Sequence, residues 1–170
     1  MDRDSLSFDD WLASIDPERD MTDRRRWLRH QFELLGPVDA ESIDVAYELE
    51  LAGALRTAIE LARSDLPDDP TRSLTYIDEP GARGIAYGYS ATFSSPMTHS
   101  PPWRMSQLIV DVADYVQEHV SEERMRVWPT CTNHGLGLHP KVANHGPVWR
   151  CSHGPHDVAV IGQLHASSRE

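Results

Sequence analysis

The feature that most constrains this chain is the concentration of cysteine and histidine near its C-terminus. Both cysteines and five of the nine histidines lie within residues 128–156, and four of those five histidines directly precede a glycine or proline. Zinc takes thiolate and imidazole ligands tetrahedrally, and a two-residue gap in a tight turn lets both side chains reach one ion. This composition predicts a metal site. The candidate ligands form two groups separated by sixteen residues, Cys131-x2-His134 and then Cys151 with either His153 (x1) or His156 (x4).

The segments around these turns have the composition of short strands. With the second turn following the aromatic-rich VWRC, the layout over about residues 127–162 resembles a zinc ribbon, whose two knuckles are usually both CxxC. The resemblance implies that Cys131, His134 and Cys151 are ligands. The chain departs from the common pattern in the second knuckle, so the fourth ligand stays open between two histidines. We prefer His156, because four intervening residues form a full turn, and keep His153 as the alternative.

A looser likeness concerns the tail as a whole. The pattern WPxCxxHxxxL…VWxC…AxIGxL is similar to the C-terminal ends of small bacterial proteins. This likeness implies that the tail is a recurring module, and it carries no activity with it.

Two other interpretations of the cysteines compete with a metal site. A Cys131–Cys151 disulfide would stabilise the fold by about 3 kcal/mol, but a cytoplasmic protein rarely keeps such a bond. Alternatively, the cysteines are buried thiols and the histidines lie in a polar loop by chance. The density of histidines beside turn residues favours metal binding over this second interpretation.

A catalytic role for the tail has little support in the sequence. A catalytic zinc needs an open coordination position and a nearby carboxylate, whereas residues 126–170 contain only Asp157 and Glu170 as acids. Zinc deaminases place a glutamate two residues after the histidine ligand, where this chain has Leu136. A nucleophilic pair of Cys151 and His153 lacks an orienting acid. We therefore expect a structural zinc ion and name no catalytic residue.

The charge of the chain is unevenly distributed. Residues 1–125 carry 12 basic and 25 acidic side chains, a net of −13, and residues 126–170 carry 4 and 2, a net of +2, which together give −11. A negative field repels phosphate polyanions and attracts basic surfaces. We expect a protein partner, which a basic surface would suit, and no nucleic acid. No feature of the sequence indicates an oligomeric state.

Membrane association is not expected either. The chain has no run of about 18 apolar residues, and its acidic start, MDRDSLSFDDW, differs from the basic and then apolar start of a secretory signal. We expect a cytoplasmic protein.

Hydrophobic periodicity predicts helices, a hairpin and a further helix upstream of the tail. Helices are expected over about residues 5–15, 22–35 and 41–64, a β-hairpin over 73–93, and a helix over 103–124 that covers the hairpin. The expected core stripe of the third helix is Val45, Leu49, Ala52, Leu55, Ile59 and Ala62, and that of the last helix is Leu108, Ile109, Val112, Val116 and Val120.

These elements together predict an α+β protein. We expect an acidic helical N-terminal body with a hairpin and a covering helix over residues 1–125, followed by a small zinc-ribbon-like β module over residues 126–165. Three function classes remain: a non-catalytic zinc-binding accessory or adaptor protein with an acidic interaction surface, an immunity-type or inhibitor protein that neutralises a basic partner, and, with least support, a zinc-dependent hydrolase. An enzyme is therefore less expected than a binding protein.

Overall fold

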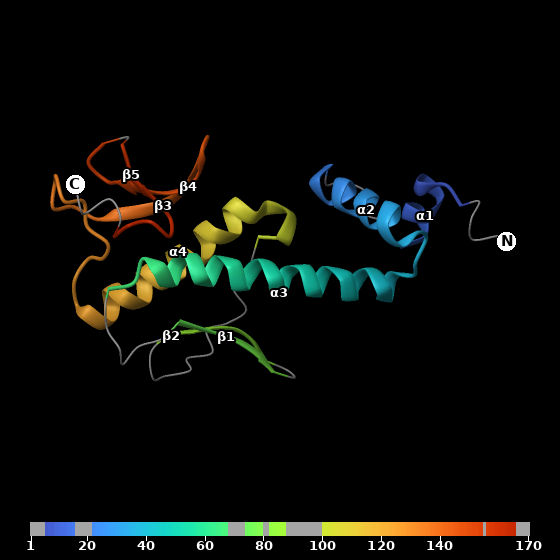
Figure 1. Ribbon diagram of the computed structural model, residues 1–170, viewed down its shortest axis with the longest axis horizontal. Coiled ribbons are helices and arrows are strands. Elements are labelled where there is room, and N and C mark those ends of the chain that lie inside the picture. Colours follow the sequence, from blue (N-terminus) through green and yellow to red (C-terminus); the bar gives the residue numbers. More distant parts are fainter. Residues whose placement is uncertain are drawn as a thin grey trace. The chain divides into compact units, whose positions relative to one another are not determined.

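The structure, a computed structural model, describes residues 6–15, 22–67, 74–79, 82–87, 100–154 and 156–165. It confirms the predicted α+β class, with a helical N-terminal part and antiparallel strands at the C-terminus (Figure 1). Residues 73, 80–81 and 88–93 of the predicted hairpin lie outside the described residues. The helices are α1 (Phe8–Ile15), α2 (Thr22–Leu35), α3 (Ala40–Ser64) and α4 (Met105–Arg124); the strands are β1 (Leu74–Glu79), β2 (Ala82–Tyr87), β3 (Leu138–Ala143), β4 (Gly146–Cys151) and β5 (Asp157–Val160).

The chain divides into two compact units, Met1–Ala52 and Gly53–Glu170, so the boundary falls within α3. The division expected after residue 125 lies inside the second unit, where α4 packs against β3 and β4. We call these parts the N-terminal unit and the C-terminal unit.

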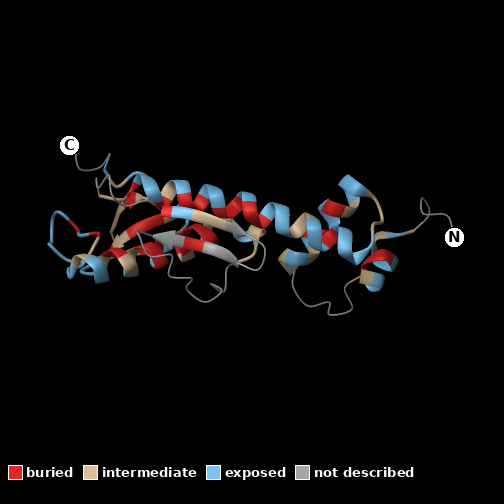
Figure 2. Cartoon of the chain, turned by 90° about the horizontal axis from the view of Figure 1, so that it is seen from below, coloured by how far each residue is buried: buried red, intermediate tan, exposed pale blue. Residues whose placement is uncertain are grey.

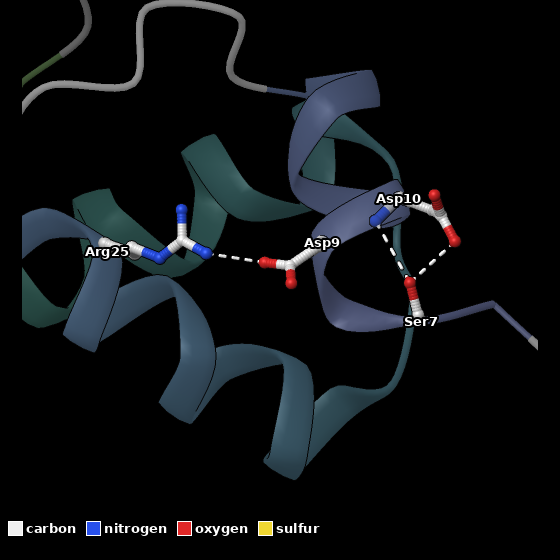
Figure 3. A network of polar contacts seen from close by, with 4 residues as sticks. All are labelled: Ser7, Asp9, Asp10 and Arg25. Carbon is white, nitrogen blue, oxygen red and sulfur yellow. Dashed lines mark hydrogen bonds and ion pairs between the residues drawn. The ribbon is translucent and has the colours of Figure 1, made fainter.

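In the N-terminal unit, α1 packs on α2 through aromatic side chains. Phe8, Trp11 and Phe32 form a cluster with ring centroids 5.1 to 5.9 Å apart. Ser7 caps α1 by accepting a hydrogen bond from the backbone N–H of Asp10 at 3.2 Å, as Figure 3 shows. In the same view Arg25 of α2 pairs with Asp9 of α1 at 2.5 Å, so this arginine is engaged locally.

The N-terminal half of α3 contacts α2 through a shared carboxylate. Glu50 accepts hydrogen bonds from the Trp27 indole at 2.6 Å and from Gln31 at 2.7 Å. The prediction that Val45 and Leu49 are core residues was wrong, because these side chains are 55% and 70% exposed. The other four members of the predicted stripe are buried. Periodicity identified a face of the helix, but other elements cover only part of that face.

The C-terminal unit has three layers. The second half of α3 and α4 form the middle layer, with the antiparallel sheet β3–β4–β5 on one side and the hairpin β1–β2 on the other (Figure 1). The hairpin is held to the helices by Arg63, which donates to the carbonyl of Leu74, and by Tyr115, whose hydroxyl donates to the carbonyl of Ile85 at 3.2 Å. The helix predicted to cover the hairpin therefore contacts it.

The burial of α4 follows its predicted pattern. All five residues of the predicted stripe are at most 6% exposed, while Asp114 and Glu118 face solvent. Figure 2 shows the same division into buried and exposed faces along the helices. The last helical residue is Arg124, and the C-cap Met125 has a left-handed backbone with φ of 50°. Within the described part of the chain, no helix combines the length and apolar composition needed to cross a bilayer.

A buried carboxylate joins the end of α3 to the C-terminal strands. Asp65 is 0% exposed and accepts hydrogen bonds from the Trp149 indole at 2.7 Å, from the backbone N–H of Gly162 at 2.6 Å and from that of Leu164 at 2.7 Å. These donors lie 84 to 99 residues further along the chain. One side chain therefore positions both β4 and the segment after β5.

Candidate metal centre

The first Cys/His turn follows α4 and precedes β3. Its backbone closes on itself, because Gly135 donates to the carbonyl of Cys131 at 2.8 Å and Cys131 donates to that of Leu136 at 2.7 Å. Gly135 has φ of +65°, a left-handed conformation that glycine adopts without the usual steric cost. This tight reversal directs Cys131 and His134 to the same side.

The second turn connects β4 to β5. Cys151 is the last residue of β4, and its N–H donates to the carbonyl of His156 at 3.2 Å, so the turn begins and ends at the two candidate ligands. The backbone N–H of His153 points at the sulfur of Cys151, 3.5 Å away. This contact holds the Cys151 sulfur at the start of the turn.

A serine holds the two turns together. Ser152 donates twice to the carbonyl of Gly137, from its N–H at 3.1 Å and from its hydroxyl at 2.6 Å. A Cβ on Gly137 would lie 2.8 Å from Cγ1 of Val127, so this position has no room for a side chain unless Val127 moves. The close packing at Gly137 and the Ser152 bonds set the spacing between the turns.

Four potential ligand atoms converge between the turns. They come from Cys131, His134, Cys151 and His156, and all lie within 4.8 Å of one another. Three sulfur-to-nitrogen distances are each 3.5 Å: Cys131 Sγ to His134 Nδ1, Cys131 Sγ to His156 Nε2, and Cys151 Sγ to His134 Nδ1. A tetrahedral ion with metal–sulfur bonds of about 2.3 Å and metal–nitrogen bonds of about 2.05 Å separates sulfur from nitrogen by about 3.5 Å. These four residues could therefore hold a metal ion.

Three other histidines of the tail are outside this group of four. His153, the alternative fourth ligand, is not in the group of four; its exposed ring lies against that of His134, with centroids 4.8 Å apart. His139 is exposed on β3, and His145 lies 3.6 Å from Asp157. The two cysteines are free thiols, so the structure contains no Cys131–Cys151 disulfide.

The surroundings of Cys131 favour its thiolate form. Burial opposes ionisation of the Cys131 thiol, but hydrogen bonds from the rings of His156 and His134 and from two backbone N–H groups of its turn lower its pKa from 9.0 to about 6. Metal ligation requires the thiolate, so a cysteine that ionises near neutral pH is prepared for it. Both sulfurs are shielded from solvent, with Cys131 1% and Cys151 3% exposed.

An ion pair supports the second turn from outside the group. Arg150 precedes Cys151, Asp157 follows His156, and the Arg150 guanidinium donates to the Asp157 carboxylate at 2.6 Å. This hydrogen bond holds the pKa of Asp157 below its ordinary value against the opposing effect of burial. The pair fixes the strand positions next to two candidate ligands, as outer groups around metal sites commonly do.

Comparisons with protein-family models, with curated proteins and with solved structures gave no match. The candidate metal centre is therefore defined by its geometry alone. Sequence reasoning missed the supporting roles of Ser152 and Asp65, which no local motif marks. The small residue Gly137 before β3 was a signal of close backbone approach that could have been noticed.

Proposed function

We propose that Cys131, His134, Cys151 and His156 bind one structural zinc ion in a zinc-ribbon-like module. The observation that carries this proposal is the set of three sulfur-to-nitrogen distances of 3.5 Å, which match the sulfur–nitrogen edge of about 3.5 Å in a zinc-centred tetrahedron. Two thiolates with two imidazoles are a common ligand set for structural zinc. Ions such as magnesium and calcium prefer oxygen ligands, so this set does not suit them.

A structural rather than catalytic role follows from the number of ligands. Four protein ligands complete a tetrahedron, whereas a catalytic zinc keeps one position for water or substrate. The sulfurs are buried, and the nearest carboxylate in sequence, Asp157, is engaged by Arg150. A zinc-dependent hydrolase would need one of the four ligands to be absent from the coordination sphere.

Metal analysis tests the zinc site directly. The full-length protein, expressed with zinc supplied and purified without chelator, should contain about one zinc per chain. Substitution by cobalt(II) should give the intense visible absorption of a tetrahedral thiolate complex. His156→Ala should lower the zinc content, while His139→Ala, an exposed histidine outside the group, should not. Less than a tenth of an equivalent of zinc in the unaltered protein would refute the site.

We further propose that the protein is a non-catalytic accessory or adaptor whose acidic surface binds a protein partner. In support, Glu41, Asp44 and Glu48 are exposed on α3 beside the apolar Val45 and Leu49. An apolar surface bordered by carboxylates suits a partner with apolar and basic groups. If that partner is a basic toxic enzyme, the protein is of the immunity or inhibitor type.

Salt-dependent binding tests the acidic surface. The partner should be captured from the native host, identified and purified, and its binding measured at low and moderate salt beside a duplex DNA. We expect partner binding that weakens with salt and after reversal of Glu41, Asp44 and Glu48 to lysine, with no tight DNA binding. Submicromolar, salt-sensitive binding to the DNA would overturn this proposal and would make the metal module the recognition element.

A further inference from the structure

A cleft of about 170 Å³ lies beside the first Cys/His turn in the C-terminal unit. Its walls come from three separate segments: the connection between α4 and β3, strand β5, and the turn after β5. The side chains that matter for its chemistry are Trp128, Thr130, Thr132, Val158, Leu164 and His165. None of these residues is a candidate metal ligand.

Trp128, which forms one wall of the cleft, is held by hydrogen bonds to α4. The carbonyl of Trp128 accepts hydrogen bonds from Gln117 at 3.0 Å and from Ser121 at 3.2 Å, and its backbone N–H donates to the Ser121 hydroxyl at 3.2 Å. The Trp128 ring also lies edge-on to that of Trp149, with centroids 5.8 Å apart. This aromatic wall is therefore held in place before any ligand arrives.

Leu164 and His165, which also line the cleft, are held by hydrogen bonds to the residues directly after α3. The backbone N–H of Leu164 donates to the buried carboxylate of Asp65, and Nε2 of His165 lies 3.0 Å from the carbonyl of Leu66. A carbonyl only accepts, so Nε2 carries a proton and, in the neutral ring, Nδ1 is an acceptor. Thr130 and Thr132 flank Cys131, so a metal bound there would hold both threonines in position.

The lining defines what the cleft can take. It contains no Asp, Glu, Lys or Arg, and it combines an indole, a proline ring, two aliphatic side chains, two hydroxyl groups and the imidazole of His165. Its volume is below the roughly 300–1,000 Å³ of pockets that enclose whole small-molecule ligands. It therefore suits a single side chain, and the hydroxyl groups can bond the polar backbone on either side of that side chain.

We propose that this cleft binds one uncharged aromatic or branched aliphatic side chain of a partner polypeptide, and that the metal centre keeps the cleft in shape. Rigid pockets that receive one buried anchor residue are typical binding hot spots in protein interfaces. A nucleic-acid base would also stack on an indole, but no Lys or Arg lines the cleft to meet its phosphate, and the chain carries a net charge of −11. The role of the metal centre in shaping the cleft rests on the proposed zinc site. The binding of a partner side chain in the cleft does not.

Capped tripeptides probe the cleft without knowledge of the natural partner. We would titrate Ac-Ala-Phe-Ala-NH2 and its leucine, glutamate and lysine analogues into the full-length zinc-loaded protein, together with adenosine and cytidine, and follow the NMR signals. The phenylalanine and leucine peptides should shift the Trp128 indole signal and the backbone signals of Thr132 and Leu164 saturably, with Kd on the order of 1–10 mM for a single anchor. No saturable shift, an equal response to the charged peptides, or tighter binding of a nucleoside would overturn the proposal.

A matched pair of variants locates the binding. Thr132 is exposed at the cleft and Val142 is exposed on β3 away from it, so neither Thr132→Arg nor Val142→Arg disturbs the core. With equal zinc content in both, Thr132→Arg should weaken peptide binding at least tenfold and Val142→Arg should leave it unchanged. Equal effects of the two variants would place the binding elsewhere.

Metal removal separates this inference from the zinc proposal. Chelation of the zinc-loaded protein should abolish the peptide-induced shifts, and added zinc should restore them. Peptide binding that is unchanged by chelation would show that the metal does not shape the cleft. One equivalent of zinc without peptide binding would refute the cleft and leave the zinc site standing, whereas absence of zinc would refute the zinc site by itself.

Discussion

Replacement of Asp65 by asparagine should destabilise the C-terminal unit markedly. Two of the three donors, the Trp149 indole and the Gly162 N–H, share Oδ2, and the Leu164 N–H points at Oδ1. An asparagine that keeps its oxygen at the Oδ2 position turns its NH2 group toward the Leu164 N–H, donor against donor. The reverse orientation loses two hydrogen bonds instead of one.

The magnitude follows from the burial of the group. Hydrogen bonds to a charged acceptor contribute roughly 1.5–3 kcal/mol each, and a buried donor without a partner costs roughly 1–3 kcal/mol. Removal of a fully buried charge partly offsets these losses, because the neutral amide is less costly to desolvate. For Asp65→Asn we expect a decrease of about 2–4 kcal/mol in the free energy of unfolding, or a fall in Tm on the order of 10 °C for a chain of this size.

Urea unfolding of the zinc-loaded protein, followed by far-UV circular dichroism, measures this effect. Hydrogen exchange at the amides of Gly162 and Leu164 should also accelerate, because both lose or weaken their acceptor. The control is Asp114→Asn on the exposed face of α4, where a change within about 0.5 kcal/mol is expected. If Asp65→Asn unfolds at the same urea concentration as the control and both amides keep their protection, the proposed anchoring role of Asp65 is wrong.

Three further outcomes are expected. His156→Ala should lower zinc affinity at least tenfold while His153→Ala leaves it nearly unchanged in a competition titration with a chromogenic chelator; the opposite order would make His153 the ligand. Chelation of the unaltered protein should direct limited proteolysis first to residues 126–165, as the masses of the fragments would show, and an unchanged cleavage pattern would argue against a structural metal. Gly162→Ala should cost about 1–3 kcal/mol in thermal unfolding, because φ there is +96° and the new Cβ would lie 2.8 Å from Cδ2 of Leu61; an unchanged Tm would show that the backbone relaxes freely.

The helices show which buried residues hydrophobic periodicity can predict and which it cannot. In α4 all five residues of the predicted stripe, from Leu108 to Val120, are buried, and the helix also buries Val110, Ala113 and Tyr115. In α3 the same reasoning identified a continuous stripe, but Val45 and Leu49 are exposed. Periodicity reports which side chains share a face of one helix, because that depends only on local geometry. It carries no information on where along the helix another element packs.

The residue types and spacings of the tail by themselves determined its chemistry: two sulfur and several imidazole donors in tight turns, which are short-range features of the chain. Only the tertiary structure decided that His156, and not His153, joins Cys131, His134 and Cys151 in one group of four. It also decided that Asp65 holds residues up to 99 positions away. The physical reason is that a local turn sets the reach of its own side chains, whereas the partners of a buried carboxylate depend on how distant segments pack.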